Sequence, residues 1–154
     1  MSEMKNFKRD FVERTIKVLN QNYNDTRYEV TLLLNCLLGM VTLPIEEKKD
    51  IKNNDIVDRF QDDCAEKLKE LAIKVKSKIK NNKLLFRNIR NSIAHLKIET
   101  NPQNNEIETI ELKNLNKGNK GIETLYILIS VKNLKIFAEY VANEYLDRFY
   151  NKKV

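Results

Sequence analysis

The segment that most constrains the fold is the run from Tyr28 to Leu43, which is apolar on almost every side of a helical wheel. A helix without a polar face must be surrounded by other elements, and this run is shorter than the about 20 apolar residues that cross a bilayer. We therefore expect it to be the buried central helix of a bundle. Pro44 is expected to end the helix, and the charged stretch from Glu46 to Asn54 is expected to be a solvated connection.

Apolar residues at helical spacing predict four further helices around this one. The first is expected over Asn6–Asn22, before a break at Asn24-Asp25-Thr26. A long amphipathic helix is expected from Phe60 to Ile79, and Asn81-Asn82 separates it from the next helix. The last helix uses apolar residues between Leu134 and Phe149.

The pattern changes to a β type between the last two helices. Asn101–Asn105 and Lys117–Gly121 are typical of turns, and Thr124–Val131 is rich in β-branched and apolar residues. Only three glycines and two prolines are present, so little linker material is available. The sequence thus predicts one domain over residues 1–154, mainly α, with about five helices in a bundle and a small antiparallel β insertion between the last two helices.

The two cysteines, Cys36 and Cys64, lie on apolar faces without metal-ligand spacing, and we expect both to be reduced core residues. One histidine and two distant cysteines do not suit a zinc site, and the chain has no glycine-rich phosphate loop or dinucleotide fingerprint. We therefore expect no cofactor and no metal. No secretory signal or membrane span is recognisable, so a cytoplasmic location is expected.

The only histidine of the chain lies in the run Arg90-Asn91-Ser92-Ile93-Ala94-His95. On a helical wheel one side of this segment is apolar and is formed by Leu85, Ile89, Ile93 and Leu96. The other side is polar around one small residue and is formed by Arg87, Arg90, Asn91, Ala94 and His95. Histidine transfers protons near neutral pH, and arginine holds phosphates through paired hydrogen bonds. The polar side therefore indicates phosphate chemistry, with an ordinary solvated helix face as the alternative.

Positive charge is concentrated around this motif. The stretch Leu71–Ile98 contains eight lysines and arginines and no acidic residue, whereas the rest of the chain is net −2 within a total of +6. A solvated lysine face is one interpretation of Lys74, Lys76, Lys78 and Lys80. Next to the motif, however, the excess favours polyanion binding, and the candidate RNA-binding residues are Lys80, Lys83, Arg87 and Lys97.

Arg90, Asn91 and His95 resemble the signature of the HEPN superfamily, an arginine and a histidine separated by four to six residues, here by four. The segments Phe11–Thr15 and Tyr28–Gly39 also resemble small bacterial HEPN proteins carried on plasmids and near defence genes. The resemblance implies a helical bundle in which two protomers bring their motifs together at one metal-independent RNA-cleaving site. It also implies a toxin or antiviral effector, with a regulatory partner protein possible. Where toxins paired with a nucleotidyltransferase antitoxin usually carry a tyrosine, this chain has Lys97.

The resemblance assigns a role to each motif residue. His95 of each protomer shares the acid and base steps, Arg90 stabilises the phosphorane, and Asn91 orients His95. Arg87 contacts a neighbouring phosphate. Two other functions remain open: a non-catalytic HEPN module that dimerises or binds RNA to regulate a partner, and a DNA-binding regulator, for which no helix-turn-helix spacing stands out.

Overall fold

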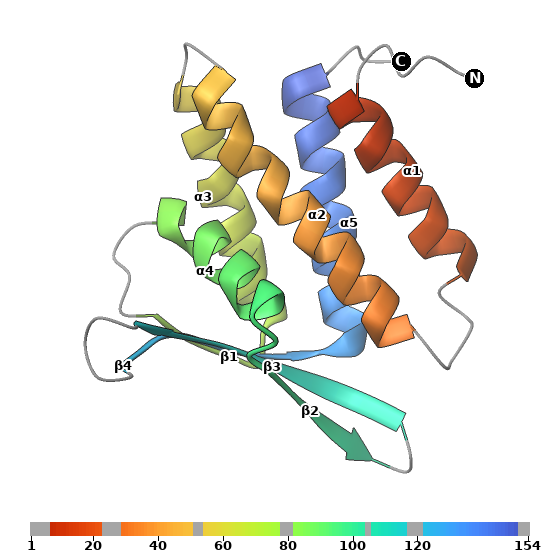
Figure 1. The fold of residues 1–154 in the computed structure, drawn as a ribbon, viewed down its shortest axis with the longest axis vertical. Coiled ribbons are helices and arrows are strands. Elements are labelled where there is room, and N and C mark those ends of the chain that lie inside the picture. Colours follow the sequence, from red (N-terminus) through yellow and green to blue (C-terminus); the bar gives the residue numbers. More distant parts are fainter. Residues whose placement is uncertain are drawn as a thin grey trace.

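In the computed structural model, the described residues are 7–22, 29–50, 54–77, 82–103, 106–116 and 122–150. They form helices that all lie on one side of an antiparallel sheet (Figure 1). The elements, in chain order, are α1 (Phe7–Asn22), α2 (Glu29–Asp50), α3 (Asn54–Leu71), β1 (Lys74–Ser77), α4 (Asn82–Ala94), β2 (Ile98–Gln103), β3 (Glu106–Asn116), β4 (Ile122–Ser130) and α5 (Val131–Tyr150).

Helix α2 is the centre of the bundle, as its uniformly apolar sequence predicts. It contacts every other helix, and Leu33, Leu37, Met40 and Val41 are fully or almost fully buried. Most of the described side chains of this helix are buried or half-buried, and the two exposed ones, Thr31 and Asn35, are polar.

The expected end of this helix at Pro44 is wrong, because α2 continues to Asp50. Proline removes its own N–H from the helical ladder, but a helix can bend around the lost bond. The expected solvated connection from Glu46 to Asn54 therefore begins as helix, and residues 51–53 lie outside the described part of the chain.

The expected long helix from Phe60 to Ile79 is also wrong beyond Leu71. Residues 74–77 form β1, in which Val75 is paired with Ile127 of β4. Val75 stands between Lys74 and Lys76, and one apolar residue between two polar ones suits a strand when another strand is present to pair with it. Ile79 lies outside the described residues.

The four strands pair in the order β1-β4-β3-β2, and all pairs are antiparallel. The expected β insertion is therefore only partly right, because β1 precedes α4 and the other three strands follow it. β2 extends through the expected turn to Gln103, whereas residues 104–105 and 117–121 lie outside the described part. One face of the sheet is buried under the helices through Ile110, Leu112, Leu125, Ile127 and Ile129.

Helix α5 is joined to the sheet and to α3. The N–H of Asn133 donates to Ser130 Oγ at 3.1 Å, which caps the start of α5. The Asn133 side chain donates to the carbonyl of Leu71 at 2.8 Å, which satisfies the end of α3. Further along, Arg148 forms ion pairs with Glu144 of its own helix and with Asp63 of α3.

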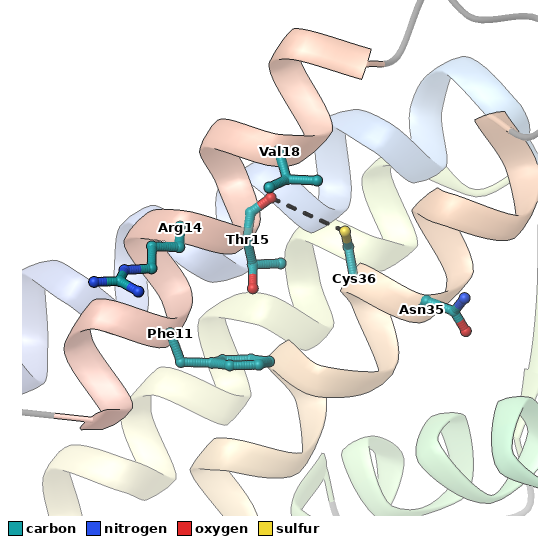
Figure 2. A pocket seen from close by; sticks show the side chains of 6 residues that line it. All are labelled: Phe11, Arg14, Thr15, Val18, Asn35 and Cys36. Carbon is teal, nitrogen blue, oxygen red and sulfur yellow. Dashed lines mark hydrogen bonds between the residues drawn. The ribbon is translucent and has the colours of Figure 1, made fainter. Parts of the chain in front are cut away.

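A cavity of about 320 Å³ lies between α1 and α2. Figure 2 shows its lining: Phe11, Arg14, Thr15, Val18, Asn35 and Cys36. Cys36 Sγ lies 4.0 Å from the carbonyl oxygen of Thr15, and both cysteines are buried and free, as predicted. None of the described helices combines the length and the apolar character needed to cross a membrane.

Candidate active site

The motif helix α4 ends in a fixed geometry at the histidine. The N–H of His95 donates to the carbonyl of Asn91 at 3.0 Å, so the helical ladder reaches His95. The next residue, Leu96, has a φ of 52°, and the N–H of Lys97 donates back to the carbonyl of Ser92 at 2.8 Å. This is the hydrogen bonding of a Schellman cap, which satisfies the last helical carbonyls. The backbone of His95 is thereby held on both sides.

Leu96 occupies the position where such a cap usually has glycine. A left-handed conformation costs about 1–2 kcal/mol for a residue with a Cβ. The side chain is 82% exposed, so packing within the chain does not offset this strain. The expected place of Leu96 in the apolar stripe with Ile93 is therefore wrong, because the helical hydrogen bonding ends with His95 and the chain turns out of the helix at Leu96.

Asn88 ties the motif helix to the sheet. Its Oδ1 accepts hydrogen bonds from Asn114 Nδ2 and, at 3.4 Å, from Thr124 Oγ1. Its Nδ2 donates to the carbonyl of Leu84 at 2.7 Å, and its own carbonyl accepts from Ser92 Oγ at 2.9 Å. Sequence analysis missed these positioning residues, because Asn114 and Thr124 are 26 and 36 residues away and no local spacing connects them to α4.

The core side of α4 packs against α3 and α2. Leu85, Phe86, Ile89 and Ile93 are buried, and the ring of Phe86 lies 5.7 Å from that of Phe60, centroid to centroid. Three of these four residues were predicted to be on the apolar side, and Phe86 extends it. With the core on one side and Asn88 bound to the sheet, the rotation of α4 about its own axis is fixed.

This rotation leaves the predicted polar side at the surface. Arg87, Ala94 and His95 are exposed, and Arg90 and Asn91 are half-buried. Successive residues of a helix are separated by about 100°, so Arg90 and His95 mark the two borders of this side and Ala94 lies between them. The hydrogen bond that joins Asn91 to His95 runs between main chains.

Arg90 is not a simple solvated cation. Its Nε is buried and has no hydrogen-bond partner within the described part of the chain. A buried donor without an acceptor is unfavourable in a native protein and calls for a specific explanation. Arg90 as a whole is half-buried, so part of its side chain reaches the surface while Nε does not.

Of the lysines predicted to bind RNA, only the side chain of Lys97 lies in the described part of the chain. Lys97 is half-buried, its carbonyl accepts from the N–H of Lys113 at 3.0 Å, and it makes no ion pair with any described residue. Lys113 is engaged with Glu99 at 2.9 Å and with Glu111 at 3.3 Å. Lys83 is the second residue of α4 but its side chain is outside the described part, and Lys80 and Lys78 lie wholly outside it.

No group of three histidine, cysteine or acidic side chains that could hold a metal occurs among the described residues. Burial raises the pKa of the Cys36 and Cys64 thiols, which keeps both in the neutral form. The groups that the motif offers for chemistry are therefore an imidazole, two guanidinium groups and an amide on one helix side. Such a set can transfer a proton and bind an anion.

A family model described as HEPN pEK499 p136 matches residues 1–153. The chain is a HEPN protein. The resemblance seen in the sequence is thus confirmed over almost the whole chain. HEPN domains in general are RNA-related modules of nuclease type that bind RNA and dimerise. Searches of curated proteins and of solved structures gave no significant match to this HEPN protein.

Proposed function

We propose that this HEPN protein is a metal-independent endoribonuclease whose site is completed by two Arg-x4-His motifs across a homodimer. The observation that carries the proposal is the half-buried Arg90 on the same anchored helix side as the exposed His95. Family membership supports an RNA-related nuclease of this type.

Arg90 supports phosphate binding because its guanidinium is partly desolvated before any ligand arrives. An ionic hydrogen bond is stronger in such surroundings than in water. A phosphate binds to the part of the guanidinium that reaches the surface, and this contact strengthens as the phosphorane gains negative charge. Arg87, one turn earlier and exposed, contacts a neighbouring phosphate.

The reaction requires a base and an acid. As the base, the imidazole of His95 takes the proton of the ribose 2′-hydroxyl, and the 2′ oxygen attacks the adjacent phosphorus. The bond from phosphorus to the 5′ oxygen then breaks, and the partner subunit's His95 gives a proton to that oxygen. The products are a 2′,3′-cyclic phosphate and a 5′-hydroxyl, so atoms and charge balance without a metal.

A homodimer solves the shortage of histidines, since one chain contains only His95. Two copies related by a twofold axis bring the same surface of each chain together. Ala94 is exposed in the middle of the polar side, and its small side chain lets a second helix approach closely. Asn91, one turn from His95, is a positioning residue in this arrangement.

The first experiment incubates purified protein with a mixed tRNA and mRNA pool in EDTA and maps the new ends. The wild type and an Asn143→Ala control, altered at an exposed site on α5, are expected to leave 2′,3′-cyclic phosphates. His95→Ala is expected to lose about 10²–10⁴-fold in rate. RNA that is bound but not cut by correctly folded dimers would favour the non-catalytic HEPN module.

The second experiment tests whether both histidines act at one site. Wild-type and His95→Ala chains are mixed in equal amounts, dissociated and reassembled. If both histidines are required, cleavage falls to about a quarter of the wild-type value, since only that fraction of dimers carries two. A fall to about a half would show that each protomer acts alone.

We further propose that the enzyme acts in the cytoplasm as a toxin or antiviral effector, on the resemblance to plasmid- and defence-borne HEPN proteins. Induced expression of the wild type is expected to arrest growth of a bacterial host, and expression of His95→Ala is not. Equal growth with both, at equal protein levels, would contradict this role.

A further inference from the structure

Leu96 combines two properties that its own chain does not explain. It is the non-glycine residue with positive φ in the described part, and its side chain is 82% exposed. A leucine in a left-handed cap is strained, and an exposed one gains little from burial. Strained residues of this kind cluster at sites where they contact a ligand. The side chain therefore has an apolar contact to make outside the chain.

The surroundings of Leu96 favour a nucleic acid as the source of that contact. Leu96 stands between His95 and Lys97, whose ammonium makes no ion pair among the described residues. The stretch Leu71–Ile98, which ends two residues after Leu96, has no acidic residue, and the next residue, Glu99, is paired with Lys113 at 2.9 Å. A polyanion with an apolar surface of its own fits both the charge and the leucine.

The distance to the reacting centre decides which part of the RNA meets Leu96. Consecutive Cα atoms are about 3.8 Å apart, and the cap fixes the backbone of both His95 and Leu96. A leucine side chain has no hydrogen-bonding group, so its contact is with the face of a base. Leucine side chains are used as apolar wedges at base steps in other nucleic-acid complexes.

We propose that Leu96 is a substrate-binding residue that packs against the nucleobase beside the phosphate on which His95 acts. This inference rests on the proposed function in that RNA is the ligand. The contact holds the base out of its stack and favours bases with a large face, so purines are preferred over pyrimidines at that position.

The test measures binding of fluorescent single-stranded RNA of about ten nucleotides by anisotropy, with every variant made in the His95→Ala protein. Leu96→Gly and Leu96→Asn are expected to weaken binding about tenfold, which corresponds to about 1.4 kcal/mol. Both residues tolerate a left-handed cap, so the melting temperature is expected to stay level or rise by about 2–4 °C. The matched control is Ile73→Ala, which removes another exposed side chain, 62% exposed, and is expected to leave binding unchanged.

An RNA series with a single abasic position, moved along the strand, identifies the contacted base. Loss of the contacted base is expected to weaken RNA binding by the His95→Ala protein about tenfold. The same loss is expected to change RNA binding by the protein that also carries Leu96→Gly very little. Equal effects of the abasic position on both proteins would overturn the inference. So would an unchanged RNA affinity of Leu96→Gly with a weakened dimer on sedimentation, because the contact would then be with a second copy.

These readouts are separate from catalysis. If the His95→Ala protein binds RNA in a Leu96-dependent way but the wild-type protein cuts none, the proposed ribonuclease activity is refuted and the Leu96 contact stands. If the wild type cuts RNA and Leu96 variants bind and cut like it at every sequence, the Leu96 inference alone fails.

Discussion

The bond between Asn88 and the sheet predicts a coupled loss of stability and activity in Asn88→Ala. The substitution removes the hydrogen bond that Asn88 Oδ1 accepts from Asn114 and the one that Asn88 donates to Leu84. It also removes the longer contact through which Asn88 Oδ1 shares the single hydroxyl proton of Thr124 with the carbonyl of Asn114. Each hydrogen bond is worth about 0.5–1.5 kcal/mol net. Thr124 keeps its bond to the carbonyl of Asn114 at 3.1 Å, and alanine favours the helix by some tenths of a kcal/mol. The expected loss is therefore about 1–2 kcal/mol.

Denaturant unfolding measures this loss, and a melting curve should show a decrease of about 2–8 °C. Because the same bonds fix the rotation of α4, cleavage by the folded protein is expected to fall about tenfold under conditions where the variant remains native. Asn143→Ala, at an exposed position of α5, is the matched control and should change neither quantity.

A double-mutant cycle with Thr124→Val tests the cause. The two substitutions share one hydrogen bond, so their effects should be non-additive by about 0.5–1 kcal/mol. Additive effects, or a stability loss with full activity, would refute the view that this bond positions the motif.

Three further predictions follow from other parts of the structure. Ala94→Arg places a long cation at the centre of the proposed twofold contact. We therefore expect monomers on sedimentation, about 10²-fold less cleavage and an unchanged melting curve. An active monomer would contradict the composite site. Burial raises the pKa of the Cys64 thiol above that of an unfolded thiol, so the free energy of unfolding should fall above about pH 8.5 by up to about 1.4 kcal/mol per pH unit. Cys64→Ala should flatten this slope in unfolding measurements. An unaltered slope would show that Cys64 does not cause it. A Cβ at Gly39 would meet the ring of Phe11 at 2.7 Å, so Gly39→Ala should be neutral or destabilising alone but stabilising by about 1 kcal/mol in a Phe11→Ala background; the same sign in both would exclude the ring as the cause.

The central helix could be predicted because its apolar composition can be recognised from consecutive residues and requires that other elements cover it. The same holds for the core side of the motif helix, whose spacing places Leu85, Ile89 and Ile93 together. β1 could not be predicted, since Val75 fits both a helical and an alternating pattern until β4, about fifty residues later, is available to pair with it.

The site shows the same division between local and distant information. Arg90 and His95 are recognisable from their spacing, but the burial of Arg90 Nε depends on neighbours that the spacing does not reveal. The left-handed Leu96 breaks the rule that glycine ends such a helix, and the helical wheel extended through it was therefore wrong. Local rules fail most often at positions where a residue serves a ligand rather than the chain's own packing.

The order of strands in the sheet also affects how the motif is made during synthesis. α4 lies between β1 and β2 in the chain, and these two strands are the opposite edges of the sheet, separated by β4 and β3. Asn114 and Thr124, which hold α4 through Asn88, follow His95 in the chain and so emerge from the ribosome after it. A nascent chain can form α4 as a helix, but it cannot orient it until β4 has emerged and joined both halves of the sheet. Under the proposed function, an unfinished copy would therefore not present an oriented motif to the message from which it is being translated.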